Sequence, residues 1–400
     1  MKKTAFRSAP MRIAIFTDNF PPQVNGVVIA TLNLIKGLAD RGHKIYVIAP
    51  RYRRGARAFE HKNVVVRRVF GIPALFYEHF KLTSFFSFRI LNYLREEKIQ
   101  LIHFPSPITL GLEAVILSRL LKLPLVGTFH TFFADPGYLK HAHLNHRATE
   151  RLFWEYSKFF YNRCDLVTSP SQETKKDLLK HGFKSAIEVI SNGIDRRVFS
   201  NAKAKEVKLK YNPHGPLLLF VGRVAHEKNI FYLLDCFRLV VREIHNAKLL
   251  IVGGGPQTDE VKEKIRHLGL ADSVVLSGEI EYARFVKSSI LGASDIFVTA
   301  SVTENQPLTV LEAQANGVVC VGIDARGMRD LVRSGYNGFL VKNGDKKAFA
   351  DAVVKILKHK NLWKKMKRNT LEEIKNHDLN RSLDQWERVL GKLIAESGRG

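Results

Sequence analysis

The sequence predicts an α/β protein with two domains, each built on a parallel sheet with crossover helices. Short apolar runs alternate with amphipathic stretches along the chain, which is the pattern of parallel strands joined by helices. The runs form two series that meet near 192–193, and each series predicts a Rossmann-like unit. In the first series we expect strands at Arg12–Thr17, Lys44–Ala49, Val64–Val69, Leu101–Phe104, Leu125–Phe129, Leu166–Ser169 and Ala186–Ile190. In the second series we expect them at Leu217–Val221, Lys248–Val252, Val274–Ser277, Ile296–Thr299, Val318–Ile323 and Gly338–Val341.

The length of 400 residues agrees with two domains. We expect an extension at 1–10, a first domain at 11–195, a second at 196–378 and a C-terminal helix at 379–400. The polar stretch Ser200–Pro216 is expected to be a linker between the domains. The first residues look like the start of a secretory signal, but no apolar core follows, so we expect no secretion.

Cysteine usage and hydropathy indicate a cytoplasmic protein that does not span a membrane. The three cysteines, Cys164, Cys236 and Cys320, are far apart and odd in number, which argues against a disulfide framework. No apolar run approaches the length that crosses a bilayer.

The charge balance is strongly basic, with 63 Lys and Arg against 38 Asp and Glu, a net charge of +25. Such a protein attracts polyanions, either nucleic acid or an anionic membrane face. The alternative is a basic proteome, in which net charge carries no information about partners. No helix-turn-helix, zinc or RNA-binding signature is present and the basic residues are dispersed, so we expect no nucleic-acid partner.

Two glutamates, Glu304 and Glu312, flank the start of a predicted helix. Glu304 follows a strand-like run, and Pro307 suits the first turn of the helix that contains Glu312. A helix N-terminus at a strand end favours a phosphate or a polar sugar, and carboxylates accept hydrogen bonds from hydroxyls. The alternative is a capped surface helix with two solvated glutamates.

Two cations occupy an earlier strand-to-helix loop. Arg223 and Lys228 follow the run Leu217–Val221 and precede a helical stretch. They are suited to clamp a diphosphate and to neutralise it as its bond to a sugar breaks. The sequence contains no Asp-x-Asp and no His/Cys cluster with metal spacing, so we expect protein cations to replace a metal ion and no cofactor to be needed.

These features together resemble the retaining glycosyltransferases of family 4, which have the two-domain GT-B fold. The resemblance covers nearly the whole chain. The matching segments are Met11-Arg-Ile-Ala-Ile-Phe-Thr-Asp18 with Pro21-Pro-Gln-Val-Asn-Gly-Val27, Gly127-Thr-Phe-His-Thr131, Ser191-Asn-Gly-Ile-Asp195, Val221-Gly-Arg223 with Lys228-Asn229, Ile251-Val-Gly-Gly-Gly-Pro256, the glutamate pair and Gly335-Tyr-Asn-Gly-Phe-Leu-Val341. The first two segments look most like members that glycosylate membrane lipids, such as diacylglycerol glucosyltransferases and related lipid mannosyltransferases.

The resemblance implies two domains that face a central cleft and a C-terminal helix that crosses back to the first domain. It implies a nucleotide-sugar donor, with Arg223 and Lys228 on the diphosphate and Glu312 on the ribose hydroxyls. Glu304 and the backbone amides after it would hold the sugar, through Asn305, Gln306, Pro307 and Leu308. Pro307 stands where relatives usually have glycine, and it donates no N–H. The run Gly253–Gly255 lacks a full Gly-x-Gly-x-x-Gly, and tight packing explains it better than a dinucleotide site.

In the first domain, the resemblance implies that His130 contacts the transferred sugar near its anomeric face and that Asn25 and Gly26 approach the donor. Relatives often have Gly-Gly at that turn, so Asn25 either adds an amide to the site or tolerates a left-handed turn. Asp18 is a tentative acceptor-binding residue that would orient or deprotonate the acceptor hydroxyl, with solvation or capping of the next helix as the alternatives. We expect a front-side substitution with retention, in which the departing diphosphate helps to deprotonate the acceptor.

Aromatic residues and cations are interleaved around 69–88, which suits insertion at an anionic bilayer interface. The same aromatics could form the core of the first domain. We expect transfer of a hexose, with UDP-glucose favoured over GDP-mannose, to a membrane lipid such as diacylglycerol, on the inner face of the cell membrane. The alternatives are a soluble or polysaccharide acceptor and a GT-B sugar-nucleotide epimerase, and the oligomeric state is left open.

Overall fold

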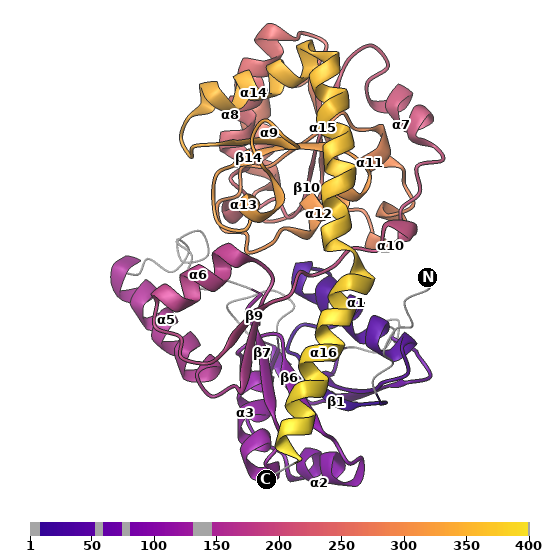
Figure 1. Ribbon diagram of the computed structural model, residues 1–400. Coiled ribbons are helices and arrows are strands. Elements are labelled where there is room, and N and C mark those ends of the chain that lie inside the picture. The colour runs from indigo at the N-terminus through magenta and orange to yellow at the C-terminus, as the bar shows by residue number, and fades with distance from the viewer. Residues whose placement is uncertain (1–8, 53–58, 74–80, 131–145, 399–400) are drawn as a thin grey trace. The chain divides into compact units, whose positions relative to one another are not determined.

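The computed structural model describes residues 9–52, 59–73, 81–130 and 146–398 and divides the chain into two compact units (Figure 1). Among these residues, unit 1 contains those up to 130 together with 146–193 and 379–398, and unit 2 contains 194–378. Each unit is described by itself. The expected extension at 1–10 lies outside the described residues up to position 8.

Unit 1 is a parallel sheet covered by helices. Its strands lie in the order β3-β2-β1-β6-β7-β8-β9, and every neighbouring pair is parallel. The strands are β1 (Arg12–Phe16), β2 (Lys44–Pro50), β3 (Val64–Val69), β6 (Leu101–Phe104), β7 (Leu125–Thr128), β8 (Leu166–Ser169) and β9 (Ile187–Val189). The helices are α1 (Gly26–Asp40), α2 (Phe88–Glu96), α3 (Thr109–Leu121), α5 (His146–Tyr161), α6 (Gln172–Lys180) and α16 (Leu379–Ser397).

Unit 1 also contains a short antiparallel pair that was not expected from the sequence, β4 (Gly71–Pro73) and β5 (Lys81–Thr83). Each strand is three residues long, and Pro73 is a poor strand residue, so neither run shows the alternation that predicts a strand.

Helix α16 packs on unit 1, as expected for a helix that returns to the first domain. Trp386 and Leu390 are buried in a cluster with α1 and the central strands. At the rim, Arg41 pairs with Asp384 at 2.7 Å and His43 with Glu387 at 2.7 Å. These buried side chains and polar contacts fix the helix to this unit.

Unit 2 repeats the plan, with a parallel sheet in the order β12-β11-β10-β13-β14-β15. Its strands are β10 (Leu217–Val221), β11 (Lys248–Val252), β12 (Val274–Gly278), β13 (Ile296–Val298), β14 (Val319–Ile323) and β15 (Gly338–Val341). The longer helices are α7 (Ala204–Tyr211), α8 (Ile230–Glu243), α9 (Thr258–His267), α12 (Leu308–Ala315), α14 (Lys346–Lys358) and α15 (Lys360–Glu373). Shorter helical turns are η2 (Arg196–Val198), η3 (His226–Lys228), α10 (Tyr282–Phe285), α11 (Ile290–Ala293), α13 (Met328–Leu331) and η4 (Ile374–His377). The strands expected in both domains are therefore confirmed.

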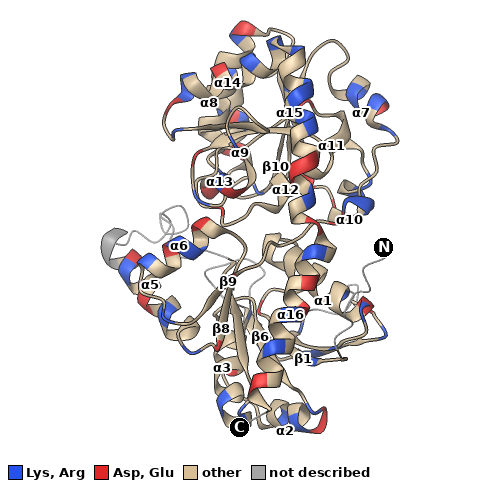
Figure 2. Cartoon of the chain, in the orientation of Figure 1, with Lys and Arg blue, Asp and Glu red and all other residues tan. Residues whose placement is uncertain are grey.

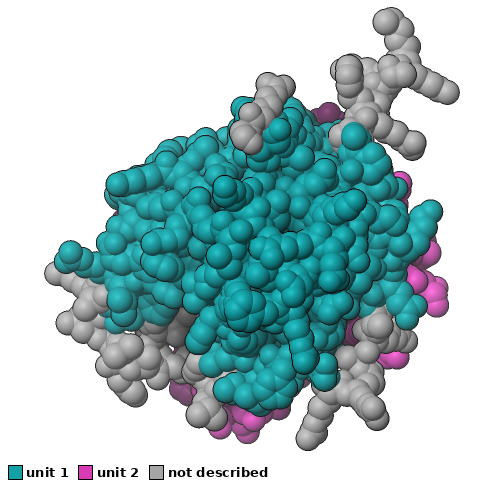
Figure 3. Space-filling view, turned by 90° about the horizontal axis from the view of Figure 1, so that it is seen from below, with its two compact units in different colours: residues 1–134, 145–193, 379–400 teal, residues 135–144, 194–378 magenta. Residues whose placement is uncertain are grey.

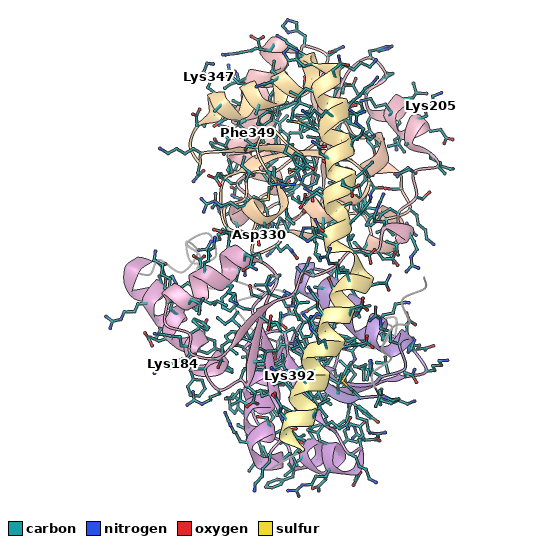
Figure 4. The ribbon with its side chains drawn as sticks, in the orientation of Figure 1. Lys184, Lys205, Asp330, Lys347, Phe349 and Lys392 are labelled. Atoms are coloured by element: carbon teal, nitrogen blue, oxygen red, sulfur yellow. The ribbon has the colours of Figure 1, made fainter. Side chains whose placement is uncertain are left out.

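Amphipathic helices cover this second sheet. On α14, Phe349 points into the unit and is 2% exposed, whereas Lys347 points outward (Figure 4). Its inward face packs against α8 and β14. Burial of one face of each helix holds the helices on the sheet.

The prediction of a linker between the domains at 200–216 is wrong. Residues Ala204–Tyr211 form α7, which packs on α11 inside unit 2. The segment is polar but ordered, because Lys208 pairs with Asp295 and the amide of Asn212 donates to two backbone carbonyls at 2.8 Å.

Lys and Arg are distributed over the helices of both units (Figure 2). Along the part of the chain that the structure describes, every helix is too short or too polar to cross a membrane.

Candidate functional site

In unit 2, the loop after β10 is anchored by its backbone on both sides of Arg223. The N–H groups of Gly222 and Val224 donate to carbonyls of β11 and of the glycine run that follows it, at 3.0 and 2.8 Å. A Cβ on Gly253 would lie 1.9 Å from the carbonyl oxygen of Gly222. The glycine run therefore allows close backbone packing, and this packing positions the exposed Arg223 at the carboxyl end of the sheet.

Lys228 ends the same loop and forms an ion pair with Glu304, which follows β13. The pair joins Lys228 Nζ to Glu304 Oε1, and the side chains are 21% and 22% exposed. The two loops are also tied by Ser301, whose Oγ donates to the carbonyl of Glu227 at 3.0 Å. Because β10 and β13 are neighbours in the sheet, a cation and a carboxylate lie side by side where the two strands end. This arrangement suits a ligand that carries a phosphate next to hydroxyl groups.

The segment between Glu304 and α12 is held by a close backbone approach. Gly327 N–H donates to the Glu304 carbonyl at 3.1 Å, and a Cβ on Gly327 would lie 1.7 Å from the carbonyl oxygen of Asn305. Pro307 is the N-cap of α12, and its own side chain makes no capping hydrogen bond. The first-turn N–H groups of α12 thus lie where the chain enters the helix after β13. The buried residues of this segment are Asn305, Gln306, Pro307 and Leu308.

Glu312 lies inside α12, 3% exposed, with Tyr282 as its hydrogen-bond partner. Tyr282 Oη donates to Glu312 Oε1 at 2.9 Å. Burial raises the pKa of Glu312 to about 7, against a smaller lowering by the Tyr282 hydrogen bond. Burial likewise raises the pKa of Tyr282, which therefore stays protonated and acts as the donor.

Sequence reasoning missed Tyr282. It lies in α10, and no motif in the sequence connects it with Glu312. Only the fold brings α10 beside α12.

In unit 1, His130 lies just past β7 beside a small cavity. The cavity lining includes His103, Thr128, His130, Thr31 and Trp386. Burial lowers the pKa of His130 to about 4, so its imidazole is neutral at pH 7. Burial also lowers the pKa of His103, to about 3, and His103 Nε2 lies 2.7 Å from the Thr128 hydroxyl. A neutral imidazole is suited to hydrogen bonding rather than to charge neutralisation.

Asn25 caps helix α1. Its side-chain oxygen accepts from Val28 N at 3.0 Å, and its φ is −155°. The left-handed alternative for Asn25 is therefore wrong, since the residue is extended as N-cap residues usually are. The adjacent Gly26 has open space where a Cβ would be, so its backbone is approachable.

Asp18 holds a helix. It is fully buried, and its Oδ1 accepts from the Thr109 hydroxyl at 2.7 Å and from Leu110 N at 3.1 Å. These bonds cap the N-terminus of α3, whereas the next helix in the chain, α1, is capped by Asn25, so the expectations of solvation and of capping the next helix are both wrong. The acceptor role of Asp18 stays a prediction. Burial raises the pKa of Asp18 to about 6.

The described residues contain no group of three or more His, Cys, Asp or Glu side chains arranged to hold a metal ion.

Comparisons with known proteins identify the family. Residues 24–198 match the model of Glycosyltransferase Family 4, and residues 201–373 match that of Glycosyl transferases group 1. The chain is 30% identical over 339 residues to a GDP-mannose-dependent alpha-mannosyltransferase of Mycolicibacterium smegmatis, covering 83% of this chain and 84% of that protein. It is 28% identical over 317 residues to an alpha-monoglucosyldiacylglycerol synthase of Streptococcus pneumoniae, covering 77% and 70%.

Among solved structures, the fold is similar to Anabaena HepE in complex with UDP. The TM-score is 0.75 at 18% identity, over 96% of this chain and 100% of that one. The two family models and the fold of two Rossmann-like units define a glycosyltransferase of the GT-B fold. The chain belongs to glycosyltransferase family 4.

Proposed function

We propose that this enzyme transfers a hexose, with retention, from a nucleotide diphosphate sugar to a membrane lipid. UDP-glucose is favoured over GDP-mannose as the donor, and diacylglycerol is the model acceptor. The observation that carries the proposal is the Lys228–Glu304 pair at the end of β10 and β13, with Arg223 on the same loop.

For each part of the nucleotide sugar, unit 2 has a residue suited to bind it. Arg223 and Lys228 bind the diphosphate, and neutralise the charge that it gains as it leaves. Glu304 and the N–H groups of the first turn of α12 bind sugar hydroxyls, while Glu312, oriented by Tyr282, accepts from the ribose. Because Pro307 has no N–H, one backbone donor is absent from this turn.

The chemistry follows from these assignments. Glu312 lies in α12 and Glu304 in the loop that leads into it, so both carboxylates hold the donor from one side. They therefore do not supply a nucleophile and an acid on opposite sides of the glycosidic bond. The acceptor oxygen then attacks from the side on which the diphosphate leaves, and the leaving phosphate oxygen takes the acceptor proton. In unit 1, neutral His130 donates a hydrogen bond to the sugar and the backbone of Gly26 approaches the donor, while Asn25 keeps the start of α1 in place. No metal or other cofactor enters this scheme.

The name of one relative supports the lipid acceptor, and the two names together leave the donor to experiment. One relative is an alpha-monoglucosyldiacylglycerol synthase and the other is a GDP-mannose-dependent alpha-mannosyltransferase, at nearly equal identity. The enzyme would act as a peripheral protein at the cytoplasmic face of the membrane.

The test is turnover with a panel of UDP- and GDP-sugars and vesicles that contain diacylglycerol. Free nucleotide and glycolipid are both recorded, with and without EDTA. We expect a donor-specific glycolipid, with a loss of about 10²- to 10³-fold in Arg223→Ala and Glu304→Gln. Arg266→Ala and Glu263→Gln, at exposed positions of α9, are the matched controls.

Two other outcomes would revise the proposal. Donor cleavage without glycolipid points to a soluble or polysaccharide acceptor, and conversion of the donor to an epimer points to an epimerase. A covalent glycosyl-enzyme on a side chain would refute the front-side substitution.

A further inference from the structure

Large apolar side chains are exposed around the β4–β5 pair of unit 1. Phe70 is 75% exposed, Ile72 57%, Phe85 61% and Phe88 72%. We call these four residues the hairpin surface. Figure 3 views unit 1 from the end at which α2 lies in Figure 1. The sequence left open whether this aromatic segment forms core, and for these four residues the structure shows that it does not.

The backbone register groups part of the hairpin surface. Gly71 pairs with Thr83 and Ile72 with Leu82, so Phe70 lies at the same end of the pair as Phe85. Phe70 and Ile72 alternate along one strand and therefore face the same side. Three further aromatics of the segment, Phe76, Tyr77 and Phe80, lie outside the described residues.

The hairpin surface is attached to a rigid base. Val69 and Phe86, the residues next to Phe70 and Phe85, pack against the main core cluster of unit 1. The Phe86 ring also contacts the Phe88 ring, at a centroid distance of 4.8 Å. Because Val69 and Phe86 pack inward, the adjacent side chains of Phe70 and Phe85 are held outward.

The charge around the hairpin surface is positive. From Val64 to Glu96, the last residue of α2, the sequence has five Lys or Arg and two acids, the exposed Glu96 and Glu78, which lies outside the described residues. Of these cations, Arg67, Arg89 and Arg95 are exposed. Exposed phenylalanines with arginines beside them match the two components of an anionic bilayer surface, its apolar interior and its charged headgroups. A nucleic acid would match the arginines and would leave an aliphatic residue such as Ile72 without a partner.

We infer that the hairpin surface docks unit 1 on an anionic lipid bilayer by inserting Phe70, Ile72, Phe85 and Phe88 among the headgroups. The inference deepens the proposed function, because a lipid acceptor would be taken from the same bilayer. Docking itself requires neither donor nor turnover, so the two proposals fail separately.

The test is flotation of the full-length protein with phosphatidylcholine vesicles that contain or lack phosphatidylglycerol, without nucleotide. We expect binding to the anionic vesicles and binding about tenfold weaker for each phenylalanine removed in Phe70→Ser and Phe88→Ser, since burying a phenylalanine contributes about that factor. The matched control is Leu120→Ser with Leu209→Ser, two leucines that are 53% and 62% exposed on α3 and α7. For charge, Arg89→Glu is compared with Arg266→Glu.

Equal binding of wild type and the Phe70→Ser/Phe88→Ser variant would overturn the inference, as would the same loss in the leucine control. Failure of the wild type to float with anionic vesicles, or displacement from them by duplex DNA at physiological salt, would also overturn it. Nucleotide-sugar binding is measured on the same preparations and should be unchanged in the hairpin variants. If vesicle docking is lost in those variants while no donor is ever turned over, docking stands and the proposed function falls.

Discussion

Replacing Tyr282 with phenylalanine should shift the pH dependence of donor binding upward. In the structure, the Tyr282 hydroxyl donates to Glu312 at 2.9 Å. Burial raises the pKa of Glu312 to about 7, and this hydrogen bond opposes the rise. A hydrogen bond to a charged group contributes about 1.5–3 kcal/mol, and one pKa unit corresponds to about 1.4 kcal/mol. Removal of the hydroxyl should therefore raise the pKa of Glu312 by about one to two units.

The sign of the effect follows from the ionised form. A carboxylate accepts hydrogen bonds from ribose more strongly than a carboxylic acid does. Wild-type affinity for the nucleotide sugar should increase as the pH rises through about 7, and the same increase in Tyr282→Phe should occur one to two units higher, at about pH 8–9. At pH 7 the variant should bind about tenfold more weakly.

The assay is calorimetric titration of a UDP- or GDP-sugar at a series of pH values. A nucleotide sugar is used because its diester diphosphate keeps a constant charge over this range. Tyr211→Phe, at the end of α7, is the control, and thermal unfolding checks that both variants fold. Superimposable pH profiles for wild type and Tyr282→Phe would refute the reasoning.

Three further predictions concern the two units. Lys228→Ala should lower donor turnover by about 10²- to 10³-fold, more than Lys228→Arg, because only the arginine keeps a cation beside Glu304; equal losses in steady-state kinetics would contradict this. Burial raises the pKa of Glu113 from 4.5 to about 7, so the folded protein retains a proton that the unfolded chain releases between those values, and stability falls as pH rises through that window. This fall in the free energy of unfolding amounts to up to about 3 kcal/mol, and Glu113→Gln should remove it. Denaturant unfolding of both proteins at acid and alkaline pH measures it, and an unchanged pH dependence in the variant would count against the prediction. Trp386→Ala should destabilise unit 1 by about 3–5 kcal/mol, visible as an earlier unfolding transition, whereas an unshifted transition would mean that α16 contributes little to it.

Local features were predictable because they depend on sequence neighbours. The strands of both sheets are apolar runs long enough to show their period, and they lie where the sequence places them. The loops with Arg223, Lys228 and Glu304 follow from the order of strand and helix, since the carboxyl ends of parallel strands meet at one edge. The three-residue strands β4 and β5 were too short to give such a signal, and the polar composition of 204–211 concealed a helix that packs on α11.

By itself, then, the sequence determined the two α/β units, the motif-bearing loops and the family, because each depends on residues close together in the chain. Tertiary structure alone decided that Tyr282 donates to Glu312, that Asp18 caps α3, and that Phe70 and Phe88 face outward while Phe86 packs inward. The hydrogen-bond partner and the burial of a side chain depend on segments that are distant in sequence. Burial in turn sets the pKa of a carboxylate and decides whether an aromatic ring is exposed to solvent.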